Sequence, residues 1–478
     1  AGCSMPGADL MTSFNDYCSL IINQFAHVYA AFYDADFKET VKNIESAKSK
    51  LAYIEIKAKE KGYPLYLIID EYDNFTNVIL SEHGQQMFHD LTHASGFYRE
   101  YFKQFKGMFD RIFMMGVSPV TLDDLSSGYN IDWNISVDPR FNAMMGFDET
   151  EVREMFHYYQ QNDMLNGDVE AMIAEMKPWY DNYCFARKSL DDDRVFNCDM
   201  TLYYLRWQVD FHRAPEEMVD KNIRTDYSKL KMLARIDRDS VQEGDRMSTI
   251  EKIAAEGDIF VDLHTSFPAE RITDIDNFRS LLYYYGLLTM CGTRGDLIKM
   301  SIPNNCVREQ YFGFLRDYYQ KYSSIDLHYL NVMLTDMAYD GRWKPFFESV
   351  AQAYRENSAV RDAMEGERNL QGFLKAYLAL ASYYLVEPEL EMNYGYCDFF
   401  LLPDKKRYPD VKHSYILELK YATRTATDAE LEVQALEGRN QLLQYSEDKI
   451  VRCLSEGTTL HRLLLQFRGW DLVRCEEV

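Results

Sequence analysis

The sequence predicts a mixed α/β protein of several domains, and three observations support this. Over roughly the first 120 residues, helical periodicity alternates with short apolar strands, which is typical of a parallel α/β sheet. Between about 150 and 360 the apolar residues recur mainly at helical spacing. After residue 385 the pattern changes to short strands around a single helix. With 478 residues, the chain is long enough for two or three domains.

The first domain is expected to repeat a helix followed by a buried strand. Helices are predicted over 14–61 and 81–108, and apolar strands over 64–70 and 111–120. Ligands of parallel α/β sheets bind at the carboxyl ends of the strands. The polar residues that follow these two strands are therefore candidates for a binding site.

We place the domains at 1–205, 206–360 and 361–478, with a helical middle domain. The last boundary follows from a polar stretch near 355–367, which precedes an apolar helix at 370–385. The last domain is predicted to contain strands at 387–402, 413–422 and 459–470 and a helix at 428–445.

The composition favours a folded cytoplasmic protein. Nine scattered cysteines without a CxxC motif indicate reduced thiols, and no apolar run is long enough to cross a bilayer, so no membrane association is expected. The formal net charge is −24, which repels nucleic acid at long range. A role on DNA would therefore need a local basic patch or a metal ion.

The strand in LIIDEYD (67–73) ends in two carboxylates, Asp70 and Glu71. In the Walker B arrangement of ATPases the first carboxylate binds Mg²⁺ and the second orients the attacking water. The alternative is an ordinary strand end that meets solvent. Such an ATP site also needs a G-x-x-x-x-G-K-[ST] loop, and the sequence contains no Gly-Lys pair. The chain is thus either part of a longer protein or lacks its phosphate loop, and we expect no ordinary ATP affinity.

A second group of charged residues lies in the predicted hairpin of the last domain. A loop centred near 407–408 would place Asp398 opposite residues 416–418, and Glu418 and Lys420 share one face of their strand. Two carboxylates can bind a divalent metal, and a lysine beside them can position water and offset charge on a scissile phosphate. The alternative is a surface hairpin with an ordinary Glu–Lys pair. The apolar strand ILELK argues against it, because buried charges are costly without a role.

The spacing of Asp398, Glu418 and Lys420 resembles the PD-(D/E)XK nuclease signature. The whole chain resembles a bacterial family that joins an AAA-ATPase-like domain to a C-terminal PD-(D/E)XK nuclease domain. The similar segments are LIIDEYD (67–73), GVSPVTLDDLSSGYNI (116–131), MMGFDETEV (144–152), WYDNYCF (179–185), SLLYYYGLLT (280–289), IPNNCVRE (302–309), ILELKYA (416–422), NQLLQY (440–445) and GTTLHRLLLQFRGW (457–470).

The resemblance implies further site residues. Glu367 and Gln441 correspond to helix residues that often complete the nuclease site, although Gln371 stands where the family often has histidine. Ser118 corresponds to a polar residue that could sense the γ-phosphate. The resemblance also implies a P-loop-type, AAA-like parallel sheet without its first strands, because the family's phosphate loop would precede Ala1, and a restriction-endonuclease-like C-terminal fold.

The function expected from these observations is Mg²⁺- or Mn²⁺-dependent cleavage of nucleic acid, with DNA favoured over RNA. Asp398 and Glu418 would bind the metal, Lys420 would assist the water, and Asp70 would be a second Mg²⁺ ligand if ATP binds. The alternative is a non-catalytic nucleic-acid-binding or regulatory protein in which both sites are remnants. The sequence leaves the oligomeric state open.

Overall fold

A computed structural model describes most of the chain. The described residues are 10–72, 104–105, 107–117, 119, 133–192, 194–220, 230, 233, 243–267, 271, 274–320, 326–356, 366–381, 383–392, 395–405 and 407–478. None of the helices among these residues is long and apolar enough to span a membrane. All eight cysteines in this part of the chain are free thiols.

The chain divides into two units, which are considered separately. The first unit comprises 1–138, 236–238 and 261–286, and the second comprises 139–235, 239–260 and 287–478. The domain boundaries expected from the sequence stay a prediction.

The first unit begins with the predicted helical region, which is broken into several helices. Ser46 starts the last of these by accepting a hydrogen bond from the Ser49 N–H, and Gly62 ends it in the left-handed conformation (φ +71°). The unit also contains α12 (Ile275–Tyr284). The helices of the opening region are α1 (Leu10–Val28), η1 (Ala30–Phe32), α2 (Phe37–Asn43) and α3 (Ala47–Lys61).

Two parallel strands follow in this unit, β1 (Tyr66–Ile69) and β2 (Arg111–Met114). Both are shorter than the predicted strands. Of the helix expected over 81–108, only 104–105 and 107–108 lie within the described residues. The parallel pairing of β1 with β2 agrees with the expected parallel α/β sheet. That this sheet is of the P-loop type stays a prediction.

Strand β1 alternates exposed and half-buried side chains, which corrects the prediction of a buried strand. Leu67 and Ile69 pack into a core that includes Phe37. The alternate side chains, Tyr66 and Ile68, are 64% and 69% exposed. Successive side chains of a strand point to opposite faces, and the helices of this core cover only one face of the pair.

The second unit begins with a helical region stabilised by capped helices around one core. Asp148 and Glu151 form a capping box at the start of its first long helix. The shared core contains Phe156, Met176 and Tyr204. The elements are η2 (Pro139–Phe141), α6 (Glu149–Gln161), α7 (Val169–Tyr180), η3 (Arg187–Ser189) and α8 (Cys198–Phe211).

The middle of the chain, which was predicted to be mostly helical, also contains a small sheet. Three strands form a small sheet in the order β3-β5-β4, and β4 and β5 are antiparallel. The strands are β3 (Asp258–Val261), β4 (Thr289–Arg294) and β5 (Leu297–Ser301). These strands are only four to six residues long, and β4 includes Gly292. So few residues do not show a recognisable alternation of apolar and polar side chains in the sequence.

Five strands in the order β10-β9-β8-β7-β6 form the C-terminal sheet. Strands β8 and β9 are parallel, and the other neighbours are antiparallel. Strand β8 and helix α18 confirm the predictions closely. The elements are β6 (Tyr384–Met392), β7 (Gly395–Pro403), β8 (His413–Ala422), α18 (Asp428–Ser446), α19 (Lys449–Leu454), β9 (Thr459–Arg468) and β10 (Asp471–Glu477).

One strand prediction in this sheet was wrong, and another placed the end of its strand two residues too late. The segment 387–402 is not one strand but parts of β6 and β7, which pair antiparallel from Met392 and Gly395 onward. The strand expected over 459–470 stops at Arg468, since Gly469 (φ +61°) turns the chain into β10. A glycine in the left-handed region permits such a tight turn.

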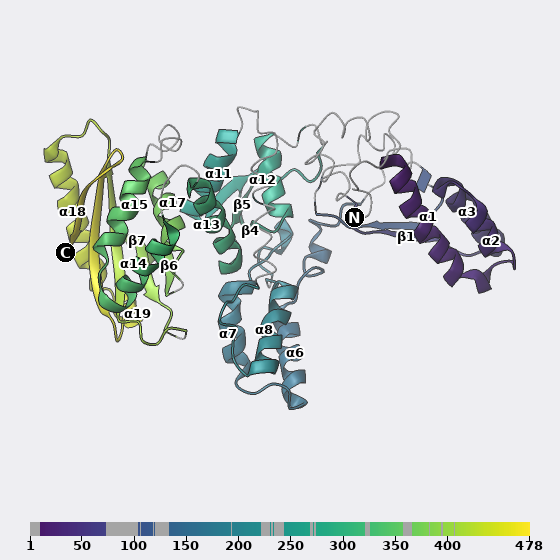
Figure 1. The fold of residues 1–478 in the computed structure, drawn as a ribbon, viewed down its shortest axis with the longest axis horizontal. Helices are drawn as coiled ribbons and strands as arrows, with labels where there is room; N and C mark the ends of the chain where they lie inside the picture. Colours follow the sequence, from purple (N-terminus) through teal and green to yellow (C-terminus); the bar gives the residue numbers. More distant parts are fainter. Residues whose placement is uncertain are drawn as a thin grey trace. The chain divides into compact units, whose positions relative to one another are not determined.

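Helices cover both faces of the C-terminal sheet (Figure 1). On one face, Ile416 and Leu464 pack with Leu442 of α18. On the other face, the Tyr415 hydroxyl donates to the Met337 carbonyl at 2.7 Å and the ring of Tyr354 contacts Phe467. The helices of the unit outside the sheet are α11 (Glu243–Glu256), α13 (Asn305–Gln320), α14 (Leu327–Asp340), α15 (Lys344–Glu356) and α17 (Glu367–Leu378).

Candidate active site

Asp398 and Glu418 lie on neighbouring strands, β7 and β8. Phe399 pairs with Leu417 and Phe400 with Ile416, so the same register sets Asp398 opposite Glu418. The backbone N–H of Leu419 donates to Oδ2 of Asp398 at 2.7 Å. This bond fixes the Asp398 carboxylate against the backbone of the strand that carries Glu418.

Lys420 lies two residues beyond Glu418 and on the same face of β8. Its ammonium donates to Oε1 of Glu418 at 2.8 Å. The side chains of Glu418 and Lys420 are only 5% and 19% exposed. Burial of this kind makes the pair unlike a solvated surface ion pair.

Helix α18 closes over the aliphatic stem of Lys420. A Cβ atom on Gly438 would lie 2.7 Å from Leu464 and 3.3 Å from Cε of Lys420. Only glycine lets the helix backbone approach the sheet this closely. Gly438 is therefore a residue that positions Lys420.

Gln441 lies one turn after Gly438 on α18. Its amide nitrogen donates to the hydroxyl of Tyr445 at 3.4 Å. Among the described residues, Oε1 of Gln441 and Oε2 of Glu418 are buried without a hydrogen-bond partner. Leaving a polar oxygen buried without a hydrogen-bond partner is costly in free energy.

Helix α17 supplies the other side of the site. The amide nitrogen of Gln371 donates to Oδ1 of Asp398 at 3.0 Å, so both carboxylate oxygens of Asp398 are hydrogen-bonded. Glu367 is exposed at the start of the helix. The structure thus brings Asp398, Glu418 and Lys420 together, with Gln371 in contact and Glu367 at the rim.

The position of α17 depends on α11, which precedes it by more than 100 residues. The buried ammonium of Lys375 donates to the carbonyl of Ala255 in the last turn of α11. A Cβ on Gly372 would lie 3.6 Å from the Glu251 carbonyl, so the two helix backbones are close. A lysine at a helix C-terminus satisfies a carbonyl that has no partner within the helix.

Burial raises the pKa of both carboxyl groups. The pKa of Glu418 rises to about 7, first because of burial and then because of the negative charge of Asp398, against the opposing effect of Lys420. Burial raises the pKa of Asp398 to about 6, although the Leu419 N–H bond lowers it. The charge of Glu367 raises both values. Two buried carboxyls that resist ionisation favour a neighbouring cation.

The residues present fit a divalent metal with oxygen ligands. Asp398, Glu418 and the side-chain oxygen of Gln441 are hard donors of the type that Mg²⁺ prefers. The described residues contain no group of three His, Cys, Asp or Glu side chains suited to a metal.

In the first unit, Asp70 and Glu71 directly follow β1, at the carboxyl end of the parallel pair. Glu71 has a positive φ of +51°, which is uncommon for a residue other than glycine. The strand end is held to its neighbour by the Tyr72 N–H, which donates to the Met115 carbonyl at 3.0 Å. Ser118 lies outside the described residues.

Sequence reasoning did not identify several residues that shape the site. Gly438 and Lys375 were not considered, and Gln371 was treated only as a departure from the family pattern. A glycine inside a long helix was a usable signal, because it usually marks close packing. No local pattern indicates that Lys375 contacts a carbonyl 120 residues away.

Two segments of the chain match family models. Residues 365–477 match the PD-(D/E)XK nuclease superfamily, and residues 5–126 match a family described as predicted AAA-ATPase. The chain therefore combines an AAA-ATPase-like segment with a PD-(D/E)XK nuclease-like segment, which confirms the predicted resemblance. No curated protein matches the sequence.

Proposed function

We propose that the C-terminal α/β region hydrolyses phosphodiester bonds of nucleic acid in the presence of Mg²⁺ or Mn²⁺. The observation that carries this proposal is the buried pair Asp398–Glu418 with Lys420 bonded to Glu418, inside the segment that matches a nuclease superfamily. Paired carboxylates beside a lysine suit phosphodiester hydrolysis.

Each residue has a distinct role in this proposal. Asp398 and Glu418 would hold the metal, with the side-chain oxygen of Gln441 as a further donor. A bound Mg²⁺ lowers the pKa of water and offsets negative charge on the phosphate. Lys420 donates hydrogen bonds toward the water and the scissile phosphate, and Glu367 at the rim adds negative charge. Gln371 keeps Asp398 oriented.

The proposed substrate is DNA rather than RNA, and the location is the cytoplasm. A net charge of −24 disfavours binding of nucleic acid in the absence of a cation. The affinity of the chain for DNA should therefore depend on the divalent metal. The second candidate is a nucleic-acid-binding or regulatory protein without catalysis. It is favoured by the hydrogen bonds that already occupy both oxygens of Asp398.

For the first unit we propose that Asp70 and Glu71 occupy the two acidic positions of an ATPase-like site, in which Asp70 would hold Mg²⁺ and Glu71 would orient water only if ATP were bound. Their place at the carboxyl end of β1 supports this, as does the matched segment. The Gly-Lys pair of a phosphate loop is absent from the sequence, so the chain is proposed not to bind ATP with ordinary affinity.

Nicking of supercoiled DNA by the full chain tests the nuclease proposal. Wild-type protein should nick in Mg²⁺ or Mn²⁺ and not in EDTA, and Lys420→Ala should lose most of this activity, by about 100-fold or more. Lys449→Ala is the matched control, because Lys449 is an exposed lysine of α19 in the same region. Labelled RNA of the same sequence tests the preference for DNA.

The outcomes separate the two candidate functions. Equal nicking by wild-type and Lys420→Ala protein would indicate a contaminating nuclease and would reject the proposed site. Metal-dependent binding of DNA without cleavage by either protein would favour the non-catalytic candidate.

A further inference from the structure

Helix α17 carries two polar side chains, Gln371 and Lys375, that lie one turn apart and therefore on the same face of the helix. The amide of Gln371 donates to Oδ1 of Asp398 at 3.0 Å. The ammonium of Lys375 lies 5.9 Å from the ring centroid of Phe399, which directly follows Asp398 in β7. Both side chains thus reach the stretch of strand that carries a proposed metal ligand.

The ammonium of Lys375 is held by a second helix. It donates to the carbonyl of Ala255 in the last turn of α11, and Lys375 is only 2% exposed. Carbonyls in the last turn of a helix have no partner within the helix, and the helix dipole favours a cation there. Burial strengthens such a bond, because little water competes for it. The bond therefore ties α17 firmly to the end of α11.

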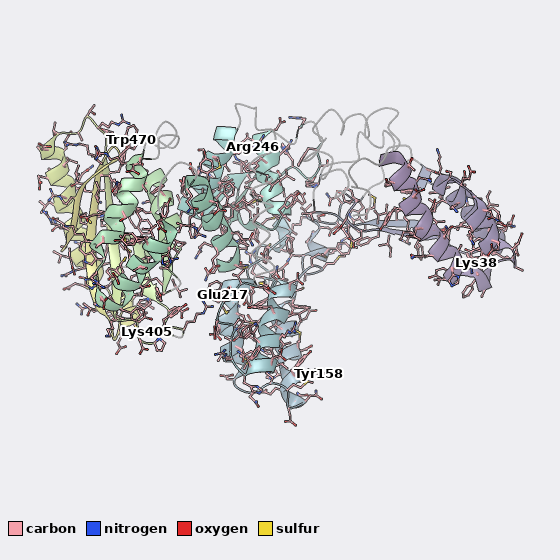
Figure 2. The ribbon with its side chains drawn as sticks, in the orientation of Figure 1. Lys38, Tyr158, Glu217, Arg246, Lys405 and Trp470 are labelled. Atoms are coloured by element: carbon pink, nitrogen blue, oxygen red, sulfur yellow. The ribbon has the colours of Figure 1, made fainter. Side chains whose placement is uncertain are left out.

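Helix α11 is itself fixed in the core of the second unit. Arg246 near its start, labelled in Figure 2, is 1% exposed, and Ala255 near its end is 3% exposed. Between them, Glu251 accepts a hydrogen bond of 3.0 Å from Tyr319 of α13. The helix lies outside residues 365–477, the segment that matches the nuclease superfamily. A helix from the middle of the chain thus supports a helix of the nuclease-like segment.

Close packing reinforces the contact between α11 and α17. A Cβ on Gly372 would lie 3.6 Å from the carbonyl oxygen of Glu251 and 3.8 Å from Cβ of Ala255. These are ordinary contact distances, so a methyl group fits there and a longer side chain does not. The next residue, Phe373, is fully buried, and its ring centroid lies 4.9 Å from that of Tyr319. A shift of α17 along α11 would disrupt these contacts.

We propose that Lys375 is a positioning residue for the candidate metal site, and that α11 controls metal binding through it. The bond from Lys375 to Ala255 fixes α17, and α17 presents the amide of Gln371 to Asp398. This inference rests on the proposed function, because it takes Asp398 as a metal ligand. It implies that the nuclease-like segment needs a helix from outside its matched range for full metal affinity.

Isothermal titration of the full chain with Mn²⁺ at about pH 8 tests this inference. This pH lies above the raised pKa values of Asp398 and Glu418, about 6 and about 7. Lys375→Met keeps the apolar stem and removes the ammonium, and it should weaken Mn²⁺ binding about 10-fold. Loss of a nearby positive charge by itself strengthens the binding of a cation, so a weaker affinity would report lost positioning.

Lys50→Met is the matched control for the loss of a buried ammonium. Lys50 belongs to the first unit, is also 2% exposed, and donates to the carbonyl of Val41 at 2.6 Å. Its replacement removes the same kind of bond from a part of the chain that does not contain the candidate site. Lys50→Met should therefore lower Tm and leave the affinity for Mn²⁺ unchanged.

A second pair of variants disturbs the helix contact without removing the charge. Gly372→Leu places a long side chain between the backbones of α11 and α17, and it should weaken Mn²⁺ binding about 10-fold as well. Gly372→Ala is its control, because a methyl group fits there, and it should bind Mn²⁺ as wild type does. Thermal unfolding shows which variants fold, and the Gly372 pair tests the inference if Lys375→Met does not fold.

The route through Gln371 is tested by combining two substitutions in one chain. If Lys375 acts through Gln371, the variant with Lys375→Met and Gln371→Met should bind Mn²⁺ no more weakly than Gln371→Met alone. Losses that add would overturn the inference, and so would wild-type affinity in folded Lys375→Met and Gly372→Leu. Failure of the proposed function gives a different result, in which the Lys375 effect on Mn²⁺ affinity persists but the wild-type chain does not nick DNA. A wild-type chain that binds no Mn²⁺ overturns both.

Discussion

Gln371 of α17 donates a hydrogen bond of 3.0 Å to Oδ1 of Asp398 in β7, while the Leu419 N–H occupies Oδ2. Asp398 is therefore oriented from a helix on one side and from the neighbouring strand on the other. Changing a group that orients a metal ligand in this way typically costs about 10- to 100-fold in metal affinity or activity.

The first prediction concerns this hydrogen bond. Gln371→Met keeps the length of the side chain and removes the amide donor, so the Asp398 carboxylate should lose part of its orientation. We expect a loss of about 10- to 100-fold in Mn²⁺ affinity or nicking activity. Gln444→Met, on the exposed face of α18, is the control and should behave as wild type. Unchanged Mn²⁺ affinity in Gln371→Met would reject a positioning role.

The second prediction concerns the dependence of stability on pH. Burial raises the pKa of Asp398 to about 6, whereas an aspartate in the unfolded chain titrates near about 4. Between these values the folded state binds more protons, so the free energy of unfolding falls as pH rises through this window. The fall in Tm between about pH 4 and about pH 8, measured in EDTA, should be smaller in Asp398→Asn by a few degrees.

A buried carboxyl outside the site provides the control for this measurement. Burial raises the pKa of Glu251 on α11 to about 7, and its carboxylate accepts a hydrogen bond from Tyr319 at 3.0 Å. Glu251→Gln should therefore reduce the same pH dependence while metal binding stays intact. An equal fall in Tm in wild type and Asp398→Asn would show that Asp398 titrates normally.

The third prediction concerns metal binding. Ligation requires ionised carboxylates, so Mn²⁺ must displace protons from Asp398 and Glu418, whose pKa values are raised to about 6 and about 7. Saturating Mn²⁺ should raise Tm more at about pH 8 than at about pH 5.5, and about 100-fold excess over Kd corresponds to about 2.7 kcal/mol. The increase should disappear in Asp398→Asn and persist in Glu251→Gln. Equal increases at both pH values would contradict carboxylate ligation.

The fourth prediction concerns the ATPase-like segment. Isothermal titration of the chain with Mg-ATP should show no binding in the micromolar range, because the sequence contains no Gly-Lys pair to form a phosphate loop. ADP and Mg²⁺ alone serve as controls. Micromolar binding that is lost in Asp70→Asn would overturn this prediction and would show that phosphates are held by another part of the chain.

Elements that depend on local interactions were predicted well. Helix α18 was expected over 428–445 and occupies Asp428–Ser446, because a capping box between Thr427 and Glu430 defines its start within a few residues of sequence. Strand β8 was predicted at its observed bounds from its continuous apolar residues. Short elements were not predicted, as in the sheet of β3, β4 and β5, because a few residues are too few to show a periodic pattern of apolar side chains.

The candidate site also combines features that local sequence patterns predicted with contacts that they did not predict. The sequence placed Asp398 opposite one of residues 416–418 and placed Glu418 and Lys420 on one face, since side chains alternate along a strand. The roles of these residues, and those of Glu367 and Gln441, stay predictions. The contacts of Gln371 and Lys375 could not be foreseen, because they join residues 27 and 120 positions apart.

The sequence by itself determined the two matched segments, the main helix and strand of the last region, and the residue types of the candidate site. Tertiary structure alone decided that Asp398 faces Glu418, that Gly438 lets α18 close over Lys420, and that α11 supports the helix bearing Gln371. Helix capping and strand alternation act between near neighbours in sequence. Register and helix docking depend on which distant surfaces pack together, and this packing is a property of the folded chain as a whole.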